Sequence, residues 1–192
     1  MKNFLVIADQ DRGKSYFIKN EILKKFHSRK NFIYDVNLEY LDFKNEIPLN
    51  RFVSKDEFLN TIPLTTHPPS SANVIFEEST GFFSRAGVTE SSLMLHIYRR
   101  FHSKNINVFV FHGLEFVPLD ILPSIDFIVL FRTSDNPTKI EKKFTNYPKI
   151  LNAYFDIQEK TKNTFFDRIK KTYPDEHSKN FFHYKRVIST KS

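Results

Sequence analysis

The 192-residue chain contains no cysteine, which excludes a disulfide framework, a cysteine-ligated zinc cluster and a thiol nucleophile. It also lacks any apolar run of about 20 residues, the length that a helix needs to cross a bilayer. The N-terminus has the pattern of a strand, not the charged-then-apolar pattern of a secretion signal. These absences lead us to expect a soluble intracellular protein.

Tryptophan is absent too, but 22 Phe and 8 Tyr contribute to an apolar content of 40%. This composition favours a folded, aromatic-rich interior, and the length corresponds to one ordinary domain or one domain with an extension. The chain shows no internal repeat and no heptad pattern.

The net charge of +7 is distributed unevenly. Residues 1–138 hold 16 basic and 16 acidic side chains, whereas residues 139–192 hold 13 basic and 6 acidic ones. A balanced front and a basic rear suggest that the rear contacts a polyanion. A solvated, lysine-rich surface explains the same numbers and remains an alternative.

The stretch near the N-terminus carries the most specific pattern in the chain. Four apolar residues, Phe4 to Ile7, predict a buried strand, and a polar turn ending in Gly13-Lys14-Ser15 leads into apolar residues at helical spacing. This is the layout of a phosphate-binding P-loop, in which backbone N–H groups and the helix start hold phosphates. The residues expected to bind nucleotide are Ala8, Asp9, Gln10, Asp11, Arg12, Gly13, Lys14, Ser15 and Tyr16.

This P-loop pattern departs from G-x-x-x-x-G-K-[ST] at one position, where Ala8 replaces the first glycine. The methyl group adds little bulk but restricts φ. A lysine-bearing helix start with no ligand is the alternative interpretation.

A second pattern places two adjacent carboxylates, Glu77 and Glu78, directly after the apolar run Val74-Ile75-Phe76. The carboxyl ends of parallel strands line the ligand crevice of an α/β sheet, so both acids are expected near the P-loop. A strand with one face in solvent would alternate apolar and polar residues, whereas this strand is a continuous apolar run. The alternative is a plain surface pair.

The remaining periodicities predict a three-layer α/β sandwich with a mainly parallel sheet of five or more strands. Ser54 and Glu57 form a capping box at the start of a short helix. The other expected elements are helices at 14–28, 90–103, 138–144 and 149–157, strands at 31–37, 106–111 and 127–131, and loops at 41–54, 63–71 and 113–123.

The order of these landmarks over residues 2–135 resembles the FtsK–HerA superfamily of P-loop ATPases, in particular viral DNA-packaging ATPases and Zot-like phage assembly proteins. The P-loop is similar to Walker A, and Val74 to Glu78 is similar to Walker B with Glu77 where Asp is usual. The other matching segments are Asp35-Val-Asn-Leu-Glu-Tyr40 after the second strand, Arg99-Arg100-Phe101-His102, and His112 at a strand end.

The resemblance implies ATP and Mg²⁺ as ligands. Lys14 would hold the β- and γ-phosphates, while Ser15 and Glu77 would position Mg²⁺. Glu78 would orient and deprotonate the attacking water, and His112 would sense the γ-phosphate. The next subunit of a homo-oligomeric ring would supply an arginine, for which the candidates are Arg100 and Arg99, followed by Arg85 and Arg132.

The implied function is an ATP-hydrolysing motor that translocates or packages nucleic acid, expected to be DNA, with residues 1–138 as the ATPase core and 139–192 as a basic, helical and aromatic extension. A phage capsid or membrane assembly would be a further partner, and the protein would reside in the host cytoplasm or with the virion. Two alternatives stay open. One is a degenerate P-loop scaffold or nucleic-acid-binding protein, which Ala8 and the basic rear favour; the other is a small-molecule phosphotransferase, against which Glu78 argues.

Overall fold

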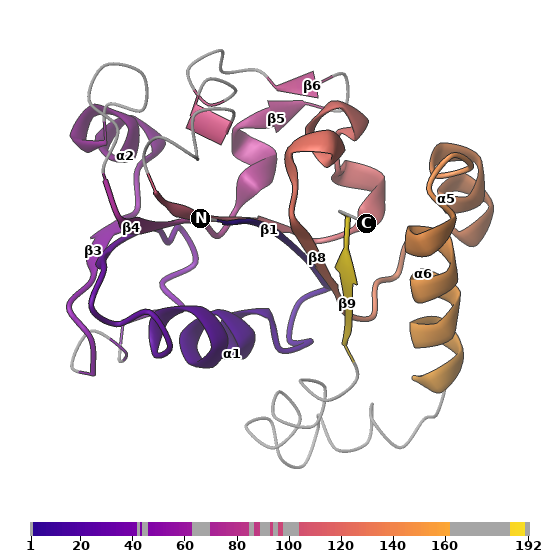
Figure 1. Ribbon diagram of the computed structural model, residues 1–192, viewed down its shortest axis with the longest axis horizontal. Coiled ribbons are helices and arrows are strands. Elements are labelled where there is room, and N and C mark those ends of the chain that lie inside the picture. Colours follow the sequence, from indigo (N-terminus) through magenta and orange to yellow (C-terminus); the bar gives the residue numbers. More distant parts are fainter. Residues whose placement is uncertain are drawn as a thin grey trace.

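Seven strands form one sheet at the centre of the computed structural model (Figure 1). Their order is β3-β2-β4-β7-β1-β8-β9, with neighbouring strands parallel except that β9 runs antiparallel to β8. The strands are β1 (Lys2–Ile7), β2 (Lys30–Tyr34), β3 (Asn50–Phe52), β4 (Ala72–Phe76), β7 (Ile106–Phe111), β8 (Phe127–Leu130) and β9 (Arg186–Ser189). The expected α/β class with a mainly parallel sheet is therefore confirmed. The structure describes residues 2–41, 43, 46–62, 70–84, 87–88, 93, 96–97, 104–161 and 185–190.

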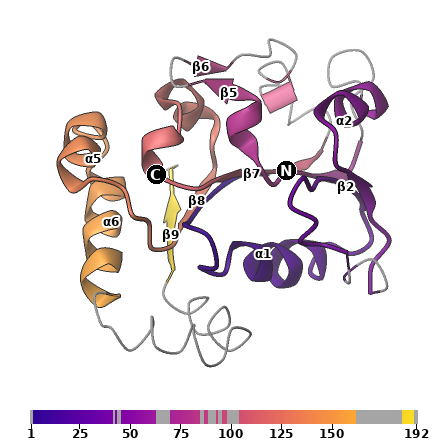
Figure 2. The ribbon, with the colours of Figure 1, turned by 180° about the vertical axis from the view of Figure 1, so that it is seen from behind.

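Helical segments cover both faces of the sheet (Figures 1 and 2). On one face, α1 (Lys14–Phe17) continues directly into a π-helix, η1 (Ile18–Leu23). The other face is covered by α2 and by short 3₁₀ turns, and the pair α5 and α6 stands beside β8 and β9. The bounds are α2 (Lys55–Thr61), η3 (Ser79–Gly81), η4 (Leu114–Phe116), η5 (Leu119–Ser124), α5 (Pro137–Lys143) and α6 (Pro148–Lys160), with a small hairpin of β5 (Phe83–Ser84) and β6 (Gly87–Val88).

Alternation along β1 divides its side chains between two cores. Leu5 and Ile7 pack in the core beneath α2 and the 3₁₀ turns, whereas Val6 and Ala8 pack in the core beneath α1 and η1. Because both faces of a parallel sheet are covered, its strands consist largely of consecutive apolar residues. The first core is rich in edge-to-face aromatic contacts, such as the 5.2 Å contact between the rings of Phe76 and Phe82.

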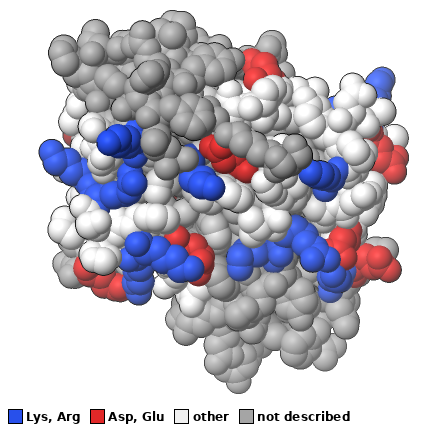
Figure 3. Space-filling model, in the orientation of Figure 1, with Lys and Arg blue, Asp and Glu red and all other residues white. Residues whose placement is uncertain are grey.

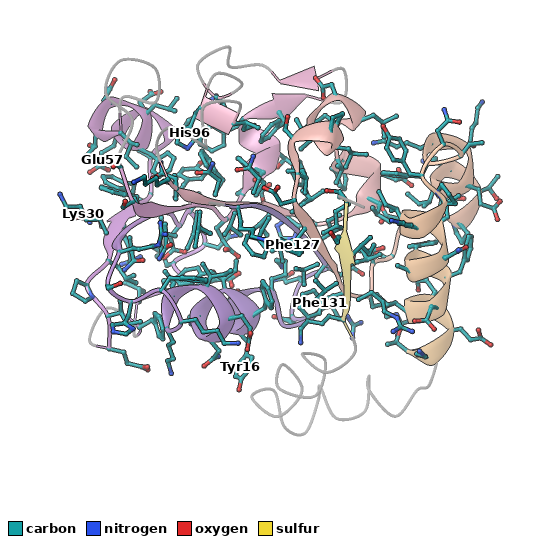
Figure 4. All side chains as sticks on the ribbon, in the orientation of Figure 1. Tyr16, Lys30, Glu57, His96, Phe127 and Phe131 are labelled. Atoms are coloured by element: carbon teal, nitrogen blue, oxygen red, sulfur yellow. The ribbon has the colours of Figure 1, made fainter. Side chains whose placement is uncertain are left out.

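A row of buried asparagines crosses the amino-terminal end of the sheet, away from the ends that carry the charged residues. Asn107 of β7 donates to Asn3 of β1 at 2.8 Å, and Asn73 of β4 donates to Asn31 of β2 at 2.7 Å. His96, which lies above the sheet in Figure 4, has its Nε2 atom 2.8 Å from Asn107 Oδ1. The amide pairs satisfy polar groups that would otherwise be buried at a cost.

Several expected elements are confirmed by the structure, and others need correction. The Ser54 hydroxyl accepts the Glu57 N–H at the start of α2, as predicted. The expected loop 41–54 contains the edge strand β3, the first helix has regular structure only to Leu23, and β2 ends at Tyr34 rather than at residue 37. Most of the expected helix 90–103 and of the connection 63–71 falls outside the described residues.

The described part of the chain holds no helix with the length and apolarity that crossing a membrane requires.

Candidate functional site

A cleft of about 890 Å³ opens at the carboxyl end of the sheet, where the loops after β1, β2, β4 and β7 meet. Strand β7 lies between β1 and β4, so its terminal residue faces both the P-loop and the acids that follow β4. The lining residues are Gln10, Asp11, Arg12, Gly13, Lys14, Ser15, Tyr16, Lys19, Asn37, Glu39, Glu78 and His112. The structure thus brings together residues 10–16, Glu78 and His112 from three separate segments of the sequence. Of the other residues predicted for the nucleotide, Asp9 lines a neighbouring cavity and Ala8 is buried.

The P-loop is anchored on both sides of β1. The Ala8 N–H donates to the Phe111 carbonyl, and the Asp9 N–H donates to the Arg132 carbonyl, both at 3.1 Å. Ala8 is buried, and it is absent from the described non-glycine residues with positive φ, so its side chain is accommodated without backbone strain.

The turn itself relies on left-handed backbone just before α1. Gly13 has φ 92° and ψ 11°, a conformation that favours glycine, and Asp11 has φ 56°. Such turns direct successive N–H groups toward one point and form anion-binding concavities. Lys14 is 4% exposed, and its Nζ atom donates to the Asp9 carbonyl at 3.2 Å, so the ammonium lies across the loop. Tyr16, one residue after the serine, projects from α1 away from the sheet (Figure 4).

Glu78 faces the cleft and pairs with His112. The His112 Nε2 atom lies 2.8 Å from a carboxylate oxygen of Glu78, and the other oxygen accepts the hydroxyl and the N–H of Thr80. Burial alone would raise the pKa of Glu78, but the hydrogen bonds with His112 and Thr80 outweigh it and hold the pKa below its usual value. The carboxylate is therefore ionised, as a proton acceptor must be.

Glu77 lies behind the cleft rather than in its lining, and only 1% of its surface is exposed. The Tyr40 hydroxyl donates to Glu77 Oε2 at 2.8 Å, and Oε1 is buried without a hydrogen-bond partner. Burial, reinforced by the negative charge of Glu39, raises the pKa of Glu77 to about 8. At neutral pH Glu77 is therefore largely protonated, and a cation at its unsatisfied oxygen would displace that proton.

Glu39 is a cleft residue to which sequence reasoning assigned no role. The Ser15 hydroxyl donates to Glu39 Oε2, and Lys19 Nζ donates to the Glu39 carbonyl at 2.8 Å. Burial raises the pKa of Glu39, although Lys14 opposes this. The signal in the sequence that points to this residue is its place in the polar segment Asp35 to Tyr40, directly after β2.

Asp35 holds that segment in shape. Its fully buried carboxylate accepts the N–H groups of Glu39 at 2.9 Å and Tyr40 at 3.2 Å, and it pairs with Arg51 Nε at 2.8 Å. The turn after β2 is therefore held in shape and tied to β3.

The residues present fit a nucleotide-bound divalent cation better than a cation held by the protein alone. Within the described ranges, no three acidic or imidazole side chains lie close enough to hold a metal ion. Mg²⁺ commonly takes one or two carboxylates together with substrate phosphates and waters. Ser15, Glu39 and the unsatisfied oxygen of Glu77 correspond to that partial set.

Of the four candidate arginines, the structure describes Arg132. It donates to the Thr161 carbonyl at the end of α6 at 2.6 Å, so it ties α6 to β8 within its own chain. Arg85, Arg99 and Arg100 lie outside the described residues.

A second cavity of about 640 Å³ adjoins the first, and Arg12 lines both. It lies between the P-loop, the segment after β8 and α6. Its lining residues are Asp9, Arg12, Arg132, Thr133, Ser134, Asp135, Pro137, Tyr154, Phe155, Gln158 and Glu159. Tyr154 and the partly exposed Phe155 give it an aromatic wall.

Solved structures share this fold. The DNA-packaging ATPase B204 from Sulfolobus Turreted Icosahedral Virus matches with a TM-score of 0.64 and 16% identity, covering 82% of this chain and 87% of that one. The genome packaging NTPase B204 from Sulfolobus turreted icosahedral virus 2 matches in complex with ATP-gammaS (TM-score 0.59, 16% identity, 76% and 80% coverage) and with AMPPCP (TM-score 0.57, 15% identity, 76% and 81% coverage).

No protein-family model and no curated protein sequence matches the chain. The comparisons therefore show that the chain shares its α/β fold with these B204 proteins.

Proposed function

We propose that the protein is an ATP hydrolase that drives the translocation or packaging of DNA. The observation that carries the proposal is the convergence of Lys14, Ser15, Glu78 and His112 on one cleft at the carboxyl end of the sheet. Together these side chains meet three requirements of phosphoryl transfer: Lys14 serves phosphate binding, Ser15 serves cation binding, and Glu78 with His112 serves water activation.

In this proposal, the P-loop binds the phosphates. Lys14 reaches across the loop to a carbonyl, and phosphate oxygens would replace that carbonyl as its partner. The turn through Gly13 directs N–H groups at the same place.

In this proposal, Glu78 deprotonates the attacking water, since its ionised carboxylate faces the cleft. A positioned general base contributes roughly 10²–10⁴-fold to such a reaction. His112 orients the carboxylate through their hydrogen bond, and it lies where it could also contact the terminal phosphate.

Ser15 and Glu77 are assigned to Mg²⁺. When bound with the nucleotide, Mg²⁺ would neutralise charge that develops on the transferred phosphoryl group. Glu77 is one methylene longer than the usual aspartate, and its unsatisfied oxygen is buried behind the cleft, so the loop would have to adjust for it to reach the ion through water.

The second cavity offers a place for the base and ribose. Phe155 provides an aromatic face for stacking, and the polar groups of Ser134 and Asp135 lie beside it. Since Arg12 lines both cavities, a nucleotide with phosphates in the first can extend into the second.

The coupling to DNA rests on the named activity of the structurally similar B204 proteins and on the basic region 139–192. On the face shown in Figure 3, Lys and Arg side chains are interspersed with Asp and Glu, so this face shows mixed charge. We further propose a homo-oligomeric ring, in which Arg99 or Arg100 of one subunit, or else Arg85, acts on the nucleotide of the next. Residues 1–138 would form the ATPase core and 139–192 an extension. The proposed setting is a phage capsid or membrane assembly, in the host cytoplasm or with the virion.

ATP hydrolysis by the full chain, measured with and without DNA, tests this function. Wild type should hydrolyse ATP with Mg²⁺ and be stimulated by DNA, because a motor couples the two. Lys14→Ala should lose ATP binding while keeping the circular dichroism of wild type. Lys25→Ala, which removes an exposed lysine paired with Glu21, is the matched control and should behave as wild type. Binding of ATP and DNA without hydrolysis would instead identify a scaffold.

A further inference from the structure

Glu39 is the acidic side chain in direct contact with the P-loop serine. Its Oε2 atom accepts the Ser15 hydroxyl, and the side chain lines the cleft together with Lys14 and Glu78. In the proposed function, the Ser15 oxygen is a ligand of the divalent cation. A carboxylate one hydrogen bond from that oxygen is therefore within reach of the same ion, either directly or through one water.

The position of Glu39 is fixed by backbone contacts rather than by its own side chain. Its N–H donates to Asp35 at 2.9 Å, and its carbonyl accepts Lys19 Nζ at 2.8 Å. The preceding Leu38 adopts a left-handed conformation with φ 58°. The turn thus holds the carboxylate toward Ser15, and no charged side chain of the described residues forms an ion pair with it.

A second, independent observation points to a cation at this place. Glu77 Oε1 is buried and has no hydrogen-bond partner among the residues that the structure describes, while Oε2 accepts the hydroxyl of Tyr40, the residue next to Glu39. The turn after β2 therefore places Glu39 at Ser15 and, through the Tyr40 hydroxyl, also contacts Glu77. Burying a charged or polar oxygen without a partner is costly, so the arrangement calls for a ligand that accepts electron pairs.

Lys14 cannot neutralise both acids during function. Its ammonium contacts the Asp9 carbonyl, and in the proposed function it binds phosphates instead. A divalent cation would place positive charge next to both acids. Carboxylate, hydroxyl and phosphate oxygens are all hard ligands, which Mg²⁺ and Mn²⁺ prefer.

We propose that Glu39 is a third protein ligand of the nucleotide-bound divalent cation, acting with Ser15 and Glu77. This inference rests on the proposed nucleotide-binding function. It assigns the segment after β2 a chemical role in the site, whereas Asp35 in the same segment is a positioning residue.

Binding of Mn²⁺ to the full chain with a β,γ-methylene analogue of ATP tests the proposal, with free Mn²⁺ followed by electron paramagnetic resonance. Glu39→Gln keeps the size of the side chain and an acceptor for the Ser15 hydroxyl but removes the charge. It should weaken Mn²⁺ binding in the ternary complex by about 10- to 100-fold, the loss typical of altered metal surroundings. Binding of the analogue in excess EDTA should be unchanged or tighter, because a negative charge near the phosphates is gone.

Glu21→Gln is the matched control, since Glu21 lies on η1 and pairs with the exposed Lys25. It should leave Mn²⁺ affinity unchanged. In the double variant Ser15→Ala/Glu39→Gln the losses should be less than additive, because both residues serve one ion.

Two outcomes overturn the proposal separately. Should wild type form the ternary complex and Glu39→Gln bind Mn²⁺ as tightly, Glu39 only positions Ser15. Should wild type bind neither the analogue nor Mn²⁺, the nucleotide-binding function fails as well. If Glu39→Gln does not fold, Glu39→Asp decides instead, since its shorter carboxylate should weaken Mn²⁺ binding and an unchanged affinity would refute the ligand role.

Discussion

At the scale of single residues, the site contains backbone that departs from ordinary conformations beside the groups that do chemistry. Asp11 and Gly13 have positive φ within the P-loop, and Leu38 has positive φ directly before Glu39. A non-glycine residue in this region costs about 1–2 kcal/mol. Such departures cluster at functional sites, where the surrounding structure holds them in place.

Leu38 allows that cost to be measured, because its side chain is exposed. Leu38→Gly removes the steric conflict, which outweighs the extra conformational entropy that glycine gives the unfolded chain, so the free energy of unfolding should rise by about 0.5–1 kcal/mol. Chemical denaturation measures this value. Leu41→Gly is the control, because Leu41 is equally exposed but is not among the described residues with positive φ; it should be neutral or destabilising. A loss of stability in Leu38→Gly would show that the turn carries no such strain.

At the scale of elements, β1, β4 and the helix α2 capped by Ser54 follow from local patterns, and the structure confirms them. Each is specified within a few residues by an apolar run or by a capping side chain. The proximity of Glu78 and His112 could also be predicted from the sequence, since both residues follow the carboxyl ends of parallel strands.

Other elements depend on distant partners. Strands β3 and β9 are three and four residues long, and their pairing with β2 and β8 gives no local signal. The π-helical turn of η1 and the contact of Glu39 with Ser15 arise from tertiary packing. For these features a single sequence supplies the residue types but not their neighbours.

His96, which contacts the row of buried asparagines, leads to a further prediction at the scale of elements. Burial lowers the pKa of His96 below its ordinary value of 6.5, although its hydrogen bond to Asn107 opposes this. The unfolded chain then takes up a proton near pH 6.5 while the folded chain does not. The free energy of unfolding should therefore fall as the pH drops below about 6.5, by at most about 1.4 kcal/mol per pH unit.

Denaturation between pH 5 and 7 checks this dependence. His96→Gln should flatten it, because the glutamine cannot be protonated. His27→Gln is the control and should keep the slope of wild type, since His27 is exposed. An identical slope in wild type and His96→Gln would mean that His96 is protonated equally in both states.

At the scale of the whole molecule, the charge surplus lies within residues 139–192. If that region contacts DNA phosphates, affinity should fall steeply with salt, with a log–log slope near −0.7 per contact on single strands. Replacing Lys170, Lys171 and Lys185 with glutamine should make the slope shallower by about 2. Of these three, the structure describes Lys185.

The matched control replaces three exposed lysines of the front half, Lys24, Lys25 and Lys30, with glutamine and should leave the salt slope unchanged. Fluorescence anisotropy of a labelled single strand over a salt series gives both slopes. Equal salt slopes in the two triple variants would show that DNA contacts a part of the protein other than residues 139–192.

The central claim, that the cleft hydrolyses ATP with Glu78 as general base, is tested most directly by the turnover of Glu78→Gln. This variant keeps the size of the side chain, so ATP binding should equal that of wild type while hydrolysis slows by at least about 10²-fold. Glu46→Gln, an exposed acid paired with Lys24, should hydrolyse ATP as wild type does. Full turnover by a folded Glu78→Gln would contradict the account, because the residue that faces both the P-loop and His112 would then have no part in the reaction.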